Sequence, residues 1–144
     1  MAIDYGDVRV GIALTDPLKI IASGYKTLKN DANLSSAIYE ICKEKTVTSI
    51  VIGLPYDQNS NIGIAAKKVI NQAVNLKEYM DKKEYAVTYF EQDERYTTRD
   101  AVTSMRDVKT KRNKKKEVVD QIAAANILRE FLSSNYKTPF KFPI

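Results

Sequence analysis

Apolar residues follow two different periods along the 144-residue chain. Short, β-branched apolar runs are typical of strands, and apolar residues that recur every three or four positions are typical of helices. The short runs predict strands over Ala2–Tyr5, Val8–Leu14, Ser23–Leu28, Val47–Leu54 and Ala86–Phe90. The longer period predicts helices after Asn33, from Ile62 to Met80, from Thr97 or Thr98 to Met105, and from Glu117 to about Leu132.

Individual residues support these boundaries. Gly6-Asp7 separates the first two apolar runs, and a tight connection of this kind predicts a β-hairpin. Asn33 is a suitable side-chain cap for the first helix, whose apolar stripe includes the single cysteine, Cys42. The nearly unbroken apolar run over 47–54 predicts a central strand that is covered on both faces.

The predicted order is β-β-β-α-β-α-β-α-α, without an internal repeat or a linker. Three strands that open as an antiparallel meander and then alternate with helices predict a mixed sheet with parallel strands and helices on both faces. The fold class is therefore α/β, in one domain over residues 1–134. Pro139 and Pro143 predict that the remaining segment, 135–144, is an irregular tail.

The net charge of +5 comes from one segment. Residues 109–116 contain six cations, and the rest of the chain has 17 basic residues against 18 acidic ones, a balance of −1. Such a run is either a solvated loop or a surface that binds the phosphates of a nucleic acid. Its members are Lys109, Lys111, Arg112, Lys114, Lys115 and Lys116.

Composition excludes several classes of site. The chain has no histidine, which excludes Ser-His-Asp triads, and one cysteine cannot supply a zinc site. A single cysteine also favours a reducing compartment. No leader-like or membrane-spanning apolar stretch is apparent, so we expect a cytoplasmic protein that does not bind membranes.

Asp4 is an unusual strand residue, because carboxylates are depleted in strands and this one lies in a short apolar run. One interpretation is an acid that hydrogen-bonds the turn at Gly6-Asp7. The other is a metal ligand, with Gly6 allowing a phosphate or a backbone to approach closely.

Asp93-Glu94 lies at the carboxyl end of a predicted parallel strand, where α/β sheets place their sites. Adjacent carboxylates repel each other unless a cation lies between them. That cation is either Arg95 or a bound divalent ion. Asp93 and Glu94 face opposite sides if the strand continues, and the sequence does not choose between them.

Asp120 lies in the first turn of the last predicted helix and in line with its apolar face, so it points toward the sheet. The alternative is an acid that stabilises the start of the helix through the dipole, a role that Glu117 serves equally well. Carboxylates gathered without histidine suit Mg²⁺ or Mn²⁺, which prefer oxygen ligands, and two such ions can activate water against a phosphodiester.

Several short motifs occur in one order along nearly the whole chain. They are Asp4-Tyr5-Gly6 with Arg9 and Gly11, Thr15-Asp16-Pro17, Gly53-Leu54-Pro55, Asp93-Glu94-Arg95 with Thr97-Thr98, and Lys115-Lys116-Glu117 before Val119-Asp120 with Ala123-Ala124. In this order they resemble the YqgF family, ribonuclease-H-like proteins described as Holliday junction resolvases and pre-16S ribosomal RNA nucleases. Two features depart from the family: only Met1 to Ile3 precede Asp4, and the loop after Pro55 has Asn59-Ser60-Asn61 in place of a glycine.

The resemblance implies a ribonuclease-H-like fold and a metal-dependent endonuclease. Asp4, Glu94 and Asp120 would be catalytic and hold Mg²⁺ or Mn²⁺, with Asp93 as a neighbour or a substitute ligand. Arg9 and Arg95 are candidates for phosphate contact, or for structural ion pairs, and the segment 109–116 would hold the backbone of the nucleic acid. The implied partner is precursor ribosomal RNA, which the resemblance favours, or branched DNA, bound by a monomer or a homodimer.

Two other classes of protein share features of this sequence. A nucleic-acid-binding module of the same fold would bind through the basic segment without cleaving. An actin-like nucleotide-binding protein would share Asp4-Tyr5-Gly6, but it requires a second lobe for which 144 residues leave no room.

Overall fold

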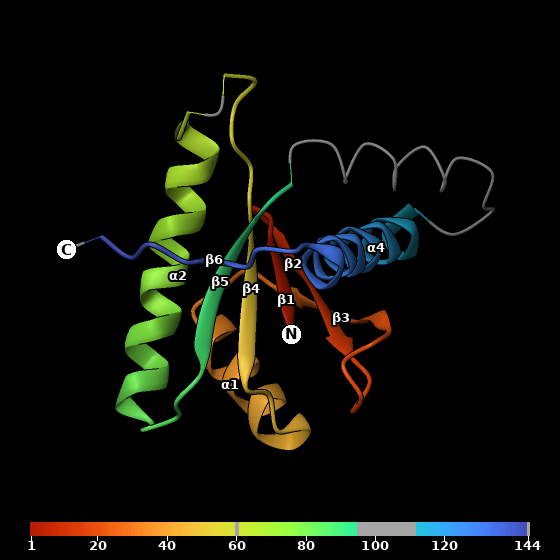
Figure 1. The fold of residues 1–144 in the computed structure, drawn as a ribbon, viewed down its shortest axis with the longest axis vertical. Helices are drawn as coiled ribbons and strands as arrows, with labels where there is room; N and C mark the ends of the chain where they lie inside the picture. Colours follow the sequence, from red (N-terminus) through yellow and green to blue (C-terminus); the bar gives the residue numbers. More distant parts are fainter. Residues whose placement is uncertain (60, 95–111, 144) are drawn as a thin grey trace.

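Three strands open the chain as the predicted antiparallel meander: β1 (Ala2–Tyr5), β2 (Arg9–Thr15) and β3 (Ala22–Lys29). The computed structural model describes residues 1–59, 61–94 and 112–143 (Figure 1). The predicted short helix from Thr97 or Thr98 to Met105 lies outside these residues. The other described elements are α1 (Leu34–Lys45), β4 (Ser49–Leu54), α2 (Ile64–Lys82), β5 (Thr88–Asp93), α4 (Arg112–Ser133) and β6 (Thr138–Pro139).

The six strands form one mixed sheet in the order β3-β2-β1-β4-β5-β6. β4 runs parallel to both β1 and β5, whereas β2, β3 and β6 join by antiparallel pairing. The carboxyl ends of β1, β4 and β5 therefore meet at one edge of the sheet, where α/β proteins place their sites. The prediction of a mixed α/β sheet is confirmed.

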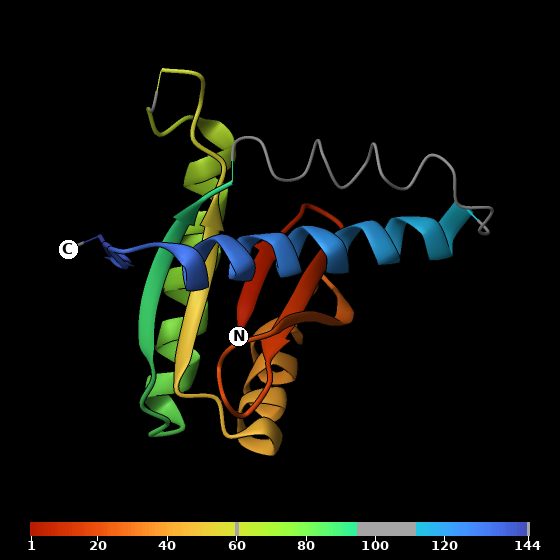
Figure 2. The same cartoon turned by 45° about the vertical axis from the view of Figure 1, so that its right-hand side comes forward.

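Helices cover both faces of the sheet. α1 and α2 lie on one face, and α4 runs across the strands on the other (Figures 1 and 2). The α1–α2 side has large core residues such as Ile3, Ile12 and Ile52, whereas the α4 side has small ones such as Ala2 and Ala13. Small side chains allow α4 to approach the sheet closely. None of the helices in the described ranges has the length and apolar character needed to cross a membrane.

α4 begins at Arg112, five residues before the predicted start at Glu117. Lys and Arg have straight side chains with good helix propensity, so the cationic run continues the helix and does not break it. Asp120 therefore lies more than two turns inside the helix. The interpretation of Asp120 or Glu117 as a dipole-stabilising acid of the first turn is wrong.

The segment 135–144 is not wholly irregular. β6 pairs with β5 through Phe90 opposite Pro139, and Phe140 is buried in the α1–α2 core. A proline is tolerated here because β6 is an edge strand that needs no donor on its outer side. β5 also ends later than the predicted end at Phe90, so Asp93 is the last residue of the strand and does not lie beyond it.

The start of α1 also differs from the prediction. Asn33 occupies the N-cap position, but its side chain makes no capping hydrogen bond. Asp31 organises this turn in its place, because its carboxylate accepts the Asn33 backbone N–H at 2.9 Å and its carbonyl accepts that of Leu34 at 3.1 Å.

Candidate active site

Asp4 lies near the centre of the sheet between two glycines. Asp4 is the direct partner of Gly11 in the β1–β2 pair, and the β1–β4 register places Gly53 on its other side. Side chains two positions apart on a strand share a face, and Ala2 packs under α4. Asp4 therefore points toward α4 and not toward the α1–α2 core.

Gly11 lets the backbone of α4 rest directly on the sheet. A Cβ atom at Gly11 would lie 2.1 Å from the backbone oxygen of Asp120, and one at Gly24 would lie 2.9 Å from Gln121 Cβ. Both positions are too close for any side chain. The two glycines thus fix the height and position of α4 and hold Asp120 above β2, next to the strand that carries Asp4.

Gly53 provides the room for Glu94. The Glu94 backbone N–H donates to the Leu54 carbonyl at 3.2 Å, so the chain stays against β4 after β5 ends. A Cβ atom at Gly53 would lie 2.7 Å from Glu94 Oε2 and 2.5 Å from Ile127 Cδ1. The Glu94 carboxyl therefore occupies the space above Gly53, beside Asp4.

The structure brings Glu94, and not Asp93, to Asp4. Phe90 packs against Phe131 of α4, whereas Glu91 accepts a hydrogen bond from the Tyr56 hydroxyl at 2.9 Å. Because side chains alternate along a strand, Glu94 shares the α4 side with Phe90, and Asp93 shares the opposite side with Glu91. Glu94 is 9% exposed, while Asp4 keeps partial contact with solvent.

Burial and repulsion change the protonation of this pair. Burial raises the pKa of Asp4 above its ordinary value, and the negative charge of Asp120 adds to the increase. Burial, followed by the charge of Asp4, raises the pKa of Glu94 to about 9. At neutral pH the pair therefore holds a proton, and protonated Glu94 donates a hydrogen bond to the Asp4 carboxylate.

The charge of Asp120 is balanced by an ion pair with Arg9. Arg9 Nε donates to Asp120 Oδ2 at 2.8 Å, and the two side chains are 33% and 20% exposed. Arg9 lies two residues before Gly11 on β2 and so faces α4 with it. Of the two sequence interpretations of Arg9, the structure shows the ion pair.

The three predicted acids thus lie close together on one side of the sheet, in two subsets. Asp4 and Glu94 share a proton, and Asp120 is bound to Arg9. Across the described ranges, no group of three or more acidic or thiol side chains has the arrangement of a formed metal site. What the structure shows is a buried carboxyl pair, a third carboxylate within electrostatic reach of it, and one guanidinium.

The structure places part of the basic segment. Lys115 is half-buried and Lys116 is exposed on α4. The helix contacts β3 where the Thr27 hydroxyl donates to the Glu117 carbonyl at 2.8 Å, and its first turns extend past this edge of the sheet (Figure 2). Arg95, Lys109 and Lys111 lie outside the described residues, as do the side chains of Arg112 and Lys114.

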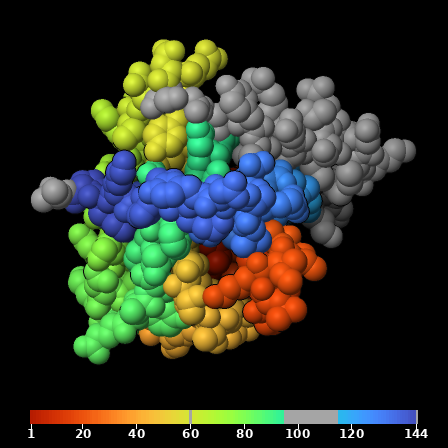
Figure 3. Space-filling view, viewed as in Figure 1, coloured from red at the N-terminus to blue at the C-terminus, as the bar shows by residue number. Residues whose placement is uncertain are grey.

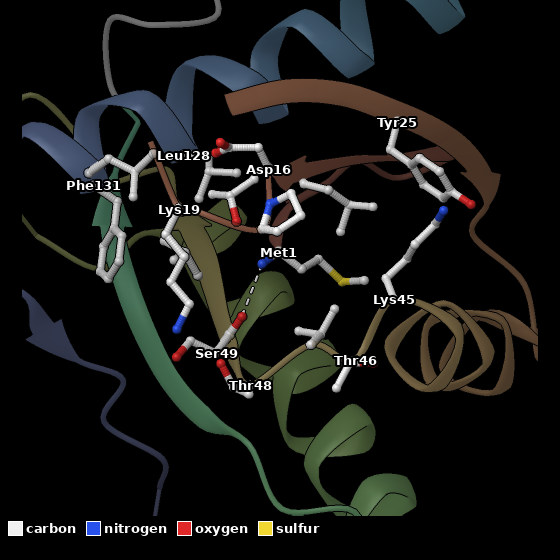
Figure 4. A pocket seen from close by; sticks show the side chains of 16 residues that line it. Met1, Asp16, Lys19, Tyr25, Lys45, Thr46, Thr48, Ser49, Leu128 and Phe131 are labelled. Atoms are coloured by element: carbon white, nitrogen blue, oxygen red, sulfur yellow. Dashed lines mark hydrogen bonds between the residues drawn. The ribbon is translucent and has the colours of Figure 1, made fainter. Parts of the chain in front are cut away.

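A cavity of about 670 Å³ lies at the other end of the sheet, around Met1 (Figure 4). In Figure 3 it is the hollow below the band that α4 and the C-terminal segment form across this face. Among the described residues that line it, Asp16 is the one acid, and its carboxylate already accepts the N–H groups of Ile20 and Ile21. None of the three clustered carboxylates lines the cavity, so we assign the candidate chemistry to the Asp4 end of the sheet.

Gly11 offers a direct test of how α4 is held. Replacing Gly11 with alanine is expected to lower the free energy of unfolding by about 3 kcal/mol, because the new Cβ would meet the backbone of α4. Gly63→Ala is the control, because nothing lies within 4 Å of its Cβ position; Gly63 is the N-cap of α2, so a loss of at most about 1 kcal/mol is expected. Urea denaturation measures both; equal effects would contradict the close packing of α4.

The sheet order and the carboxylates on β1, after β5 and on α4 define the class as a ribonuclease-H-like α/β fold. Two solved structures of Thermus thermophilus RuvC share it. The structure of RuvC alone has a TM-score of 0.58 and 9% sequence identity, and the match covers 96% of this chain and 97% of that chain. The structure "in complex with Holliday junction substrate" has a TM-score of 0.56 and 12% identity, and the match covers 96% of each chain. The chain belongs to the family described as "RuvX: Holliday junction resolvase", whose model matches residues 1–134. This family of nucleases confirms the resemblance seen in the motifs.

Curated relatives cover nearly the same length. A Clostridium tetani protein is 38% identical over 139 residues, which are 94% of this chain and 96% of the relative. A Clostridium botulinum protein is 35% identical over 136 residues, 93% of this chain and 96% of the relative. Both bear the name "Putative pre-16S rRNA nuclease".

Proposed function

We propose that this chain is a divalent-cation-dependent endonuclease that hydrolyses phosphodiester bonds in precursor 16S ribosomal RNA, at its 5′ end, or in Holliday junctions. The observation that carries the proposal is the placement of Asp4 and Glu94 in one enclosed pair, with Asp120 close enough to raise the pKa of Asp4. The names of the relatives support the RNA substrate, and the family description supports the DNA substrate.

The residues present fit a divalent cation. Two carboxyl groups forced together by the fold repel each other, and here the repulsion is relieved by a proton. A cation would relieve it more completely, and carboxylate oxygens are the ligands that Mg²⁺ and Mn²⁺ prefer. When bound, such an ion supplies an activated water and stabilises the leaving oxygen of a phosphodiester.

Individual residues of the chain would bind the cation and the phosphate. Asp4, Glu94 and Asp120 would hold Mg²⁺ or Mn²⁺, and Glu94 would give up its proton when the ion binds. Asp93 faces away from this pair and is the weaker candidate ligand. Arg9, beside Asp120, and Arg95 would contact phosphate.

The basic segment would bind the backbone of the nucleic acid. Lys115 and Lys116 lie on the same helix as Asp120, so a nucleic-acid backbone that binds to them would pass close to the acids. Lys109, Lys111, Arg112 and Lys114 complete the segment. A cytoplasmic location accords with either substrate, and cutting both strands of a junction would call for a homodimer, whereas RNA processing needs only a monomer.

A non-catalytic nucleic-acid-binding module of the same fold is the second candidate. The observation that favours it is the division of the acids, because Arg9 already holds Asp120. A module of this kind would keep its basic surface and would bind either substrate without cutting it.

The test uses the full chain with a four-way DNA junction and with a 5′-extended precursor 16S ribosomal RNA fragment. Each substrate is incubated with Mg²⁺, Mn²⁺ or EDTA, and the products are resolved by electrophoresis. Cleavage of one substrate with a cation and none in EDTA is expected. Cleavage that persists in EDTA would contradict the role of the cation, and binding of both substrates without cleavage would favour the second candidate.

A further inference from the structure

Arg9 is the counter-ion of Asp120 in the cation-free site. Its Nε donates to Asp120 Oδ2 at 2.8 Å, while Asp4 and Glu94 pair with each other. Within the described parts of the chain no trio of acids is assembled. Asp120 is near enough for its charge to act on Asp4, but its own side chain is bound to Arg9.

The backbone of α4 is packed closely against the sheet at this point. Gly11 and Gly24 pack against the helix at Asp120 and Gln121 with no room for even a Cβ atom. The side chains of Arg9 and Asp120 are both partly exposed, so they have room to change rotamer. A partly solvated ion pair is weak, so a competing charge can displace one partner at small cost.

We propose that Arg9 is a positioning residue that holds Asp120 in the cation-free site and gives it up when a divalent cation binds. Arg9 and the cation then compete for one carboxylate. This inference rests on the proposed function, because it takes Asp120 to be a ligand of the cation. It adds a step that the ligands alone do not contain: the third acid joins the site only after an ion pair has opened.

A double-mutant cycle tests the competition. Mn²⁺ binding to the full chain is measured by titration calorimetry, without nucleic acid, for wild type, Arg9→Met, Asp120→Asn and the double variant. Arg9→Met is expected to bind Mn²⁺ about fivefold more tightly than wild type, because Asp120 no longer has to leave a partner. In the Asp120→Asn background the same substitution is expected to change the affinity by less than about twofold.

Two further variants separate the ion pair from other effects. Lys68→Met removes a positive charge that pairs with Asp7 in the β1–β2 turn, and a change below about twofold is expected. Arg9→Gln is expected to reproduce Arg9→Met, because the lost ion pair and not the lost packing decides the result.

Each outcome has one meaning. An equal gain from Arg9→Met in both backgrounds, or weaker Mn²⁺ binding by Arg9→Met than by wild type, would overturn the role of Arg9 and leave the proposed function intact. If wild type itself binds no Mn²⁺, the cation site of the proposed function fails, and the inference fails with it.

Discussion

Asp4→Asn is expected to reduce cleavage on the order of a thousandfold while leaving the protein folded. Asp4 is the acid at the centre of the site: it faces α4, it contacts Glu94, and its pKa is raised further by Asp120. Asparagine keeps the size of the side chain but removes the negative charge that would hold a cation. Single-turnover cleavage of the preferred substrate with Mn²⁺ measures the loss.

The matched control is Asp7→Asn, three residues further along the same hairpin. Asp7 is exposed, and its ion pair with Lys68 at 3.6 Å is a solvated surface contact. Cleavage within about threefold of wild type is expected for this variant. If Asp4→Asn cleaves as well as Asp7→Asn, the acid pair is not the active site.

Glu94→Gln is expected to stabilise the cation-free protein, although Glu94 is one of the proposed catalytic acids. The unfolded chain releases the Glu94 proton near the ordinary pKa of 4.5, whereas the folded protein keeps it up to about 9. Between these values the native state binds more protons than the unfolded state, so the free energy of unfolding falls as the pH rises. Glutamine removes this loss, a gain of roughly 3 kcal/mol at pH 7.

Urea denaturation at several pH values in EDTA checks this result. The advantage of Glu94→Gln over wild type should be absent below about pH 4.5 and should grow toward pH 9. Millimolar Mg²⁺ should restore the stability of wild type more than that of the variant. Glu91→Gln is the control: Glu91 is buried on the same strand but accepts the Tyr56 hydroxyl on the opposite face, so no stabilisation is expected. A pH-independent difference would contradict the raised pKa of Glu94.

Much of the fold could be predicted because its signals are local. The Gly6-Asp7 hairpin and the unbroken apolar run before Gly53 each depend on a few consecutive residues. The errors arise where neighbours in space decide the structure. The pairing of Pro139 with Phe90 joins segments far apart in the sequence, and the cationic run reads equally well as a loop or as the helix it begins.

The candidate site, too, could be predicted only in part from the sequence. The sequence identifies the acids by type and position, but the choice of Glu94 over Asp93 depends on the face to which β5 turns each side chain. The pairing of Arg9 with Asp120 spans 111 positions and has no local signal. The roles of Gly11 and Gly53 were missed, although a glycine inside a strand is a known sign of close approach by another group.

The close seating of α4 on Gly11 has a consequence for where a strand of nucleic acid would be cut. Lys116 and Asp120 are four residues apart on a rigid helix, so they lie on one side of it and about 6 Å apart along its axis. A phosphate held by Lys116 would therefore lie near the acids, because the sheet fixes the helix at Asp120. In this way the contact between α4 and Gly11 would set how far the basic segment lies from the acids, and so where the bound strand is cut.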